Sequence, residues 1–157
     1  PAREWRGALH RREEGLDLLS HGGGEGASAE WLAGIDGYDL VLLDLPLGMA
    51  PVIPCRRLLV VNADANCHVR LHRHPWAADE RLLVTQFSSQ RALQQGLLDL
   101  WLAGGLPLLN LHLHRDEAMA EAMAAKLPVG RYAPTSLVAH ELAALATWCL
   151  AEGEAPR

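Results

Sequence analysis

The sequence has 157 residues, of which 50% are hydrophobic and 21% are charged, enough apolar material for one globular domain with its own core. The formal net charge of −5 argues against broad attraction to nucleic-acid phosphates or anionic lipids, so we expect neither partner. No apolar run approaches the roughly 20 residues that cross a bilayer, and the start lacks the apolar stretch of a secretory signal. We therefore expect a cytoplasmic protein that forms a single domain over residues 1–157.

The three cysteines, Cys55, Cys67 and Cys149, are odd in number, far apart and without Cys-x-x-Cys spacing. This arrangement predicts neither a disulfide framework nor a zinc site. We expect all three to be reduced and mostly to serve as packing residues.

Short apolar runs alternate with longer segments of helical period, the pattern of parallel strands joined by crossover helices. The sequence therefore predicts an α/β fold with a mostly parallel sheet flanked by helices. In chain order, the expected strands are residues 15–19, 38–44, 57–62, 82–86 and 106–112. The segment 38–44 is a continuous apolar run of the kind found in central strands that are buried on both faces.

Helices are expected between and after these strands, each beginning at a polar cap. In chain order they are a short helix capped by Ser28 after the glycine loop 22–26, a helix through Cys67 and His72, a helix from Leu93 to Leu102 capped by Ser88 or Ser89, a helix from Asp116 to about Lys126, and a helix capped by Thr135 or Ser136 that runs through Trp148.

One strand end carries a pattern with recognisable chemistry, Asp44-Leu-Pro46-Leu-Gly48. In nucleotide-dependent switches, a carboxylate here holds Mg²⁺ through its water shell, and a glycine four residues later lets a backbone N–H reach the γ-phosphate. Asp44 would be the metal-binding residue and Gly48 the phosphate-binding one. An aspartate that merely caps a loop at a strand end explains the short pattern equally well.

Longer blocks carry a family resemblance. Residues 61–72, VNADANCHVRLH, are similar to VNVDANCHIRLH of the BcsQ (YhjQ) family, the MinD/ParA-like ATPases associated with bacterial cellulose synthase. Residues 114–121, HRDEAMAE, 124–130, AAKLPVG, and 145–150, LATWCL, resemble further blocks of that family in the same order. The resemblance covers most of the chain from about Leu16 to Leu150.

The resemblance implies a deviant P-loop NTPase fold, ATP-dependent dimerisation and a cytoplasmic role with accessory subunits of the inner-membrane cellulose synthase complex. The family's Gly-rich, lysine-bearing Walker A loop is expected before Leu16, but residues 1–15 do not contain it, and Gly22–Gly26 has no following Lys-Ser/Thr to hold a triphosphate. We therefore interpret the chain as the N-terminally truncated, C-terminal part of the fold and doubt that it hydrolyses ATP with Mg²⁺.

The family's adenine-reading position follows the strand 82–86, and here the candidates are Gln86 and Ser88, either of which can hydrogen-bond a purine. Ordinary loop chemistry explains these polar residues as well. The acidic C-terminus, with Glu152 and Glu154, would be repelled by anionic lipid, so direct membrane binding is not expected.

His68, His72 and His74 could be imagined as a metal site, but Arg70 and Arg73 between them would oppose a cation, and no His-Glu-x-x-His pattern is present.

Three hypotheses remain for the function of the chain. The first is a regulatory, localising or scaffold protein of the cellulose machinery that does not hydrolyse ATP in this form. The second is an ATP-binding dimeric ATPase whose Walker A loop lies outside this chain, and the third, a metal hydrolase, has little support. An exposed sheet edge also predicts self-association into homo-oligomers.

Overall fold

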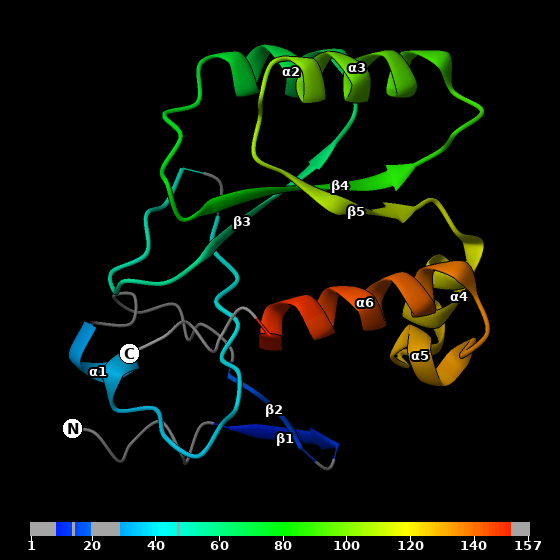
Figure 1. The fold of residues 1–157 in the computed structure, drawn as a ribbon. Helices are drawn as coiled ribbons and strands as arrows, with labels where there is room; N and C mark the ends of the chain where they lie inside the picture. The colour runs from blue at the N-terminus through cyan, green and yellow to red at the C-terminus, as the bar shows by residue number, and fades with distance from the viewer. Residues whose placement is uncertain (1–8, 14, 20–28, 47, 152–157) are drawn as a thin grey trace. The chain divides into compact units, whose positions relative to one another are not determined.

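The computed structural model describes residues 9–13, 15–19, 29–46 and 48–151. Its internal contacts divide the chain into two compact units, residues 1–55 and 56–157. The single domain expected over residues 1–157 stays a prediction. The α/β architecture is confirmed, since three parallel strands in the second unit are flanked by helices (Figure 1).

The first unit contains a small antiparallel pair, β1 (His10–Glu13) and β2 (Leu16–Leu18), and a short helix α1 (Ala29–Ala33). Strand β2 confirms the expected strand at 15–19, and Gly15 takes the left-handed conformation (φ 81°) in the turn before it. The Tyr38 hydroxyl donates a hydrogen bond of 2.7 Å to Asp17. The glycine loop 22–26 and the expected cap at Ser28 lie outside the described residues.

The expected strand at 38–44 is wrong. This segment has no regular structure, and its apolar side chains are exposed except for the half-buried Leu43, with Leu42 at 77%. A strand needs a neighbouring backbone to pair its N–H and C=O groups, and within the described residues this segment joins neither sheet. Apolar composition indicated a tendency to be buried, but it did not supply a pairing partner.

The second unit is built on a parallel sheet with the order β3 (Arg57–Asn62), β4 (Glu80–Phe87), β5 (Leu108–His114). Strand β4 pairs with β3 on one side and with β5 on the other. Consecutive residues of a strand point to opposite faces, and Leu82, Leu83 and Val84 are all at most 2% exposed. Both faces of the sheet are therefore covered at β4.

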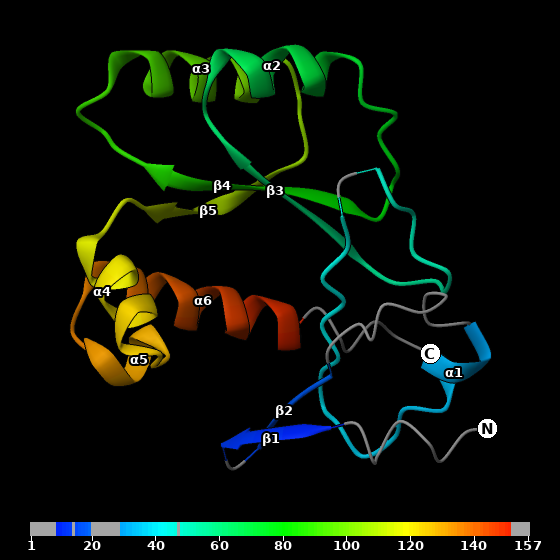
Figure 2. The same cartoon turned by 180° about the vertical axis from the view of Figure 1, so that it is seen from behind.

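The helices form one layer on each face of this sheet. Figures 1 and 2 show α2 (Ala65–His72) and α3 (Ala92–Ala103) on one face, and α6 (Leu137–Ala151) on the other, with α4 (Glu117–Ala125) and α5 (Val129–Tyr132) beside it. Trp101 of α3 is 2% exposed and belongs to a hydrophobic cluster that includes Leu82 and Val84 of β4. Its Nε1 donates a 3.0 Å hydrogen bond to Nδ1 of His68. None of the helices in the described ranges is long and apolar enough to cross a membrane.

Two expected helix starts, at Asp116 and Ser136, are confirmed by their caps, and Asp64 caps the expected helix through Cys67. Asp64 accepts from the Cys67 N–H, Asp116 from the Ala118 N–H and Ser136 from the Ala139 N–H, which satisfies amides that a helix start leaves open. The expected cap of α3 at Ser88 or Ser89 is wrong, because Arg91 occupies the N-cap position and makes no side-chain cap bond.

The start of one strand and the presence of one helix also differ from expectation. Strand β5 begins at Leu108 rather than at residue 106, because Pro107 has no N–H for the ladder. The short helix α5 had no counterpart among the expected elements.

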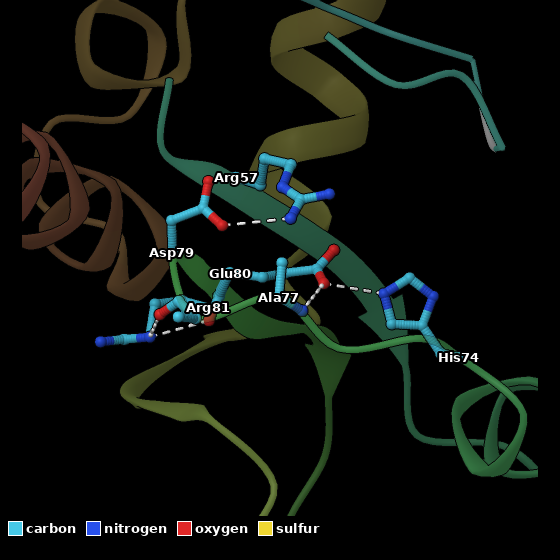
Figure 3. Close-up of polar contacts among 7 residues, drawn as sticks. Arg57, His74, Ala77, Asp79, Glu80 and Arg81 are labelled. Carbon is cyan, nitrogen blue, oxygen red and sulfur yellow. Dashed lines mark hydrogen bonds and ion pairs between the residues drawn. The ribbon is translucent and has the colours of Figure 1, made fainter. Parts of the chain in front are cut away.

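Polar side chains organise the amino ends of β3 and β4 (Figure 3). The carboxylate of Glu80, a residue only 4% exposed, lies 2.8 Å from Nε2 of His74 and accepts from the Ala77 N–H. The Arg57 guanidinium donates to Asp79 at 3.1 Å, and this hydrogen bond holds the pKa of the Asp79 carboxyl below its usual value. Because a buried carboxylate needs such partners, the network explains how Glu80 is tolerated inside.

The two-sided burial of β4 gives the first prediction. Leu82→Ala should lower the free energy of unfolding by about 2 to 5 kcal/mol, because it leaves a cavity at a fully buried position. Leu102→Ala is the matched control, since Leu102 is 58% exposed, and its effect should stay within about 0.5 kcal/mol. Urea unfolding followed by circular dichroism measures both, and equal effects would contradict the assignment of β4 as the central strand.

Candidate functional site

The three parallel strands end at one edge of the sheet, and the loops that follow them form a polar pocket. Ligands in open α/β sheets bind at this carboxyl edge. The cavity has a volume of about 220 Å³, and its lining residues come from all three loops and the start of α3: Asn62, Ala63, Asp64, Gln86, Arg91, Leu93, Gln94 and Arg115. We call it the carboxyl-edge pocket.

The end of β4 and the loop after it form the most constrained part of this pocket. Gln86 has a left-handed backbone, φ 50°, a conformation that costs a non-glycine residue of order 1 kcal/mol. Gln94, 7% exposed, holds the loop: its Oε1 accepts from the Ser88 N–H at 2.8 Å, and its Nε2 donates to the Gln86 carbonyl at 3.4 Å. The buried Gln94 thus holds the strained end of β4, at Gln86, and the following Ser88 in place beside the pocket.

Charged residues lie on the rim. Arg91 and Arg115 both line the pocket, and their backbone N–H groups donate to consecutive carbonyls of the β4 loop, Ser88 at 3.0 Å and Phe87 at 2.9 Å. The ion pair of Arg115 with Glu117 is long, 3.7 Å, and exposed, so it contributes little. The pocket lining thus combines two arginines with the polar residues Asn62, Gln86 and Gln94.

The cysteine next to the pocket is not set up as a nucleophile. Burial and the nearby Asp64 carboxylate raise the pKa of the Cys67 thiol above its usual value, and the opposing effects of Arg70 and of a backbone hydrogen bond are smaller. The reactive form of cysteine is the thiolate. Cys67 is therefore a protonated packing residue at neutral pH, as the sequence indicated.

The four sequence-predicted site residues fall into two groups. Gln86 lines the carboxyl-edge pocket, and Ser88, two residues on, takes part in the loop that forms it through its backbone N–H. Asp44 and Gly48 belong to the first compact unit, where Asp44 is exposed. Gly48 has φ 85°, which favours glycine, and the Met49 N–H donates to the Pro46 carbonyl at 3.0 Å, so the chain turns between Pro46 and Met49, after Asp44.

Sequence reasoning missed Arg91, Gln94 and Arg115. Each lies just after a strand end or on the first turn of the next helix, and the rule that ligands bind at the carboxyl edge was the available signal. Their residue types carried no motif of their own. Asn62, the last residue of β3, also lines the pocket, and its Oδ1 accepts a 3.0 Å hydrogen bond from the Thr85 hydroxyl.

The histidines make structural contacts. The His114 backbone N–H donates to Glu141 of α6 at 2.7 Å, and its ring nitrogen bonds the same carboxylate, while the ring of Phe87 packs edge-on against His112 and His114. Within the described ranges, no group of three or more His, Cys, Asp or Glu side chains could hold a metal ion.

A larger hollow of about 600 Å³ lies among α4, α5 and α6. Its lining side chains are apolar: Met119, Ala122, Met123, Leu127, Pro128, Val129, Ala139, Leu142 and Ala143, with Gly130. It offers no polar side chain for chemistry, so the carboxyl-edge pocket is the candidate site.

The fold and site define an α/β protein whose parallel sheet carries a polar pocket at the edge used by MinD/ParA-like nucleotide switches. The family model described as cellulose biosynthesis protein BcsQ matches residues 1–150. The cellulose biosynthesis protein BcsQ of Salmonella typhimurium (strain LT2) is 37% identical to this chain over an alignment 170 residues long, gaps included. The alignment covers 94% of this chain and 68% of that protein.

The cellulose biosynthesis protein BcsQ of Escherichia coli (strain K12) is 40% identical over 119 residues, covering 72% of the chain and 48% of that protein. The match thus spans about half the length of that relative. The chain belongs to the BcsQ family of cellulose biosynthesis proteins, and the resemblance drawn from the blocks at 61–72 and 114–130 is confirmed.

The role of Gln94 can be tested by a pair of neighbouring substitutions. Gln94→Leu leaves the Ser88 N–H without its buried acceptor and should lower the free energy of unfolding by about 1 to 3 kcal/mol. Gln95→Leu removes an exposed hydrogen bond to the Ser89 carbonyl and should change it by less than about 1 kcal/mol. Thermal or urea melts measure both; if Gln95→Leu is the more destabilising, Gln94 does not hold the loop.

Proposed function

We propose that this chain serves the bacterial cellulose biosynthesis machinery as a regulatory, localising or scaffold protein, and that it does not hydrolyse ATP by itself. Membership of the BcsQ family supports the role in cellulose biosynthesis. The proposed partners are accessory subunits of the cellulose synthase complex, to which a cytoplasmic protein would be recruited, and homo-oligomers are part of the proposal.

The observation that carries the non-hydrolytic part is the composition of the carboxyl-edge pocket. Within the described part of the chain, its lining contains no lysine and no glycine-rich loop, whereas triphosphate binding uses a lysine charge and a ring of backbone N–H groups. The single lysine of the sequence, Lys126, is the C-cap of α4 and does not line the pocket. A cavity of about 220 Å³ is also smaller than typical ligand pockets of about 300 to 1,000 Å³.

The residues of the second unit therefore do not fit Mg·ATP as a whole. Asp64, the carboxylate at the pocket, already accepts the Cys67 N–H as a helix cap, and the proposed Mg²⁺ ligand, Asp44, belongs to the first unit. We derive no hydrolytic step for this chain.

A second candidate function is an ATP-binding dimeric ATPase that receives its Walker A loop from outside these residues. The observation favouring it is the turn between Pro46 and Met49, after Asp44, with a left-handed Gly48, together with the strained Gln86 at the pocket. Under this alternative, Asp44 holds Mg²⁺, Gly48 approaches the γ-phosphate, and Gln86 or Ser88 contacts the base.

Calorimetric titration of the purified chain with Mg·ATP separates the two candidates. We expect no binding tighter than millimolar, no dependence on Mg²⁺, and no change in the Asp44→Ala variant, because the parts that hold a triphosphate are missing. Micromolar binding that requires Mg²⁺ and disappears in Asp44→Ala would reject the non-hydrolytic proposal in favour of the alternative.

A second experiment asks whether the role in cellulose biosynthesis depends on nucleotide chemistry. In a cellulose-producing bacterium that encodes this chain, deletion should reduce secreted cellulose, and the chain with Asp44→Ala should restore it as well as the unchanged chain does. Cellulose is measured as glucose released by cellulase. Restoration by the unchanged chain but not by Asp44→Ala would point to a nucleotide-driven mechanism, and unchanged cellulose after deletion would contradict the proposed role itself.

A further inference from the structure

We propose that β3 pairs along its outer edge with β3 of a second copy of this chain, in an antiparallel arrangement around a twofold axis at Val60. The two three-stranded sheets then join into one. This inference rests on the homo-oligomers included in the proposed function, and it names the surface that forms them.

The backbone of β3 has hydrogen-bonding groups that β4 does not use. β3 is an edge strand beside β4, and the N–H of Arg57, its first residue, donates to the Asp79 carbonyl just before β4 at 3.2 Å. The N–H and C=O groups of successive strand residues point alternately to the two sides of the strand. Those of Leu58, Val60 and Asn62 therefore point away from β4, to a side where no other described strand pairs.

The edge at β3 is open to a further strand, whereas the opposite edge of the sheet is protected. Proteins protect sheet edges with bulges, prolines and charges. β3 pairs with β4 in unbroken register from Arg57 to Asn62, contains no proline and carries its one charge at its first residue. β5 has two register shifts against β4 and follows Pro107. An added strand therefore fits β3 better than β5.

Side-chain exposure marks the same edge. Leu59 and Val61 belong to the hydrophobic cluster that contains Trp101 of α3, whereas Leu58 packs against the cluster that contains residues of α6. Val60 shares the face of Leu58, because alternate residues of a strand lie on one face, and Val60 is 56% exposed. A second strand would cover it, since β-branched residues that lie opposite each other stabilise an antiparallel pair.

The outward-pointing residues also fix the register of the pair. Hydrogen-bonded pairs in an antiparallel ladder recur at every second residue, so an axis at Val60 sets its two copies opposite each other and Leu58 opposite the partner's Asn62. The Asn62 carbonyl accepts from the Asp64 N–H at 2.9 Å and keeps a second lone pair for this contact. The two copies of Arg57 lie at opposite ends of the ladder, so their like charges do not meet.

The test measures amide hydrogen exchange by NMR on the ¹⁵N-labelled 157-residue chain at low and high protein concentration, with sedimentation velocity on the same samples. One strand per copy is a small interface, so the dimer should form only as the concentration rises. Exchange at the amides of Leu58, Val60 and Asn62 should then slow about tenfold, without Mg·ATP, because these amides gain hydrogen bonds. The amides of Leu59 and Val61, which already face β4, should not change.

A pair of valine variants assigns the dimer to this edge. Val60→Lys places two like charges opposite each other on the axis and should weaken dimerisation about tenfold or more. Val69→Lys is the matched control, because Val69 is similarly exposed, 52%, but lies on α2; it should leave dimerisation unchanged. Circular dichroism verifies that both variants are folded, and the exchange pattern of the unchanged chain tests the pairing without any substitution.

Four outcomes would overturn the proposal. Val69→Lys could weaken the dimer as much as Val60→Lys, which would mean a general effect of charge. A dimer could form without slower exchange at Leu58, Val60 and Asn62, which would place the interface elsewhere and leave the proposed homo-oligomers standing. Residues 39–44 could become protected together with β3, which would mean that this segment of the second copy, and not its β3, adds the strand.

In the fourth outcome the chain stays monomeric at every concentration. That result would remove homo-oligomers from the proposed function as well, whereas the role in cellulose biosynthesis is decided separately by the deletion experiment.

Discussion

The pairing of β4 with strands on both sides is the interaction on which the second unit depends. It satisfies the backbone groups of β4 in a place where water does not reach, since Leu82, Leu83 and Val84 are at most 2% exposed. Unpaired backbone groups there would be strongly destabilising. The two helix layers exist because each face of this strand must be covered, and the carboxyl-edge pocket exists because three parallel strands stop together.

The alternation of apolar runs and helical periods was sufficient to predict the strands and all the helices of this unit except α5. It worked for β3 and β4 because each is a short run of apolar residues, and for α2 because a longer segment follows the first of these runs. It failed at residues 38–44, whose apolar character equals that of β3, because strand formation depends on a pairing partner and not on hydrophobicity alone. It also misplaced the cap of α3, since the Ser88 N–H and carbonyl are already used by Gln94 and Arg91 and the helix begins later.

The site was only partly predictable, for a related reason. Gln86 stood out as a polar residue at a strand end and lies in the pocket. Gln94 lies in a helix beside a second glutamine, Gln95, with no motif to distinguish the two, and its role depends on the path of the backbone six to eight residues earlier. Arg91 and Arg115 are 24 positions apart, and only the parallel order of β4 and β5 brings their residues to one cavity.

The strain at Gln86 is informative because the rest of the loop is arranged to maintain it. A glycine at this position would adopt φ 50° without strain, and its flexible backbone would loosen the loop, whereas glutamine keeps a side chain at the pocket. Gln94 is buried to 7% exposure and makes both of its amide bonds to this loop. A residue that served packing alone would be apolar, so the two amide hydrogen bonds of Gln94 identify it as the group that holds Gln86 and Ser88 in place.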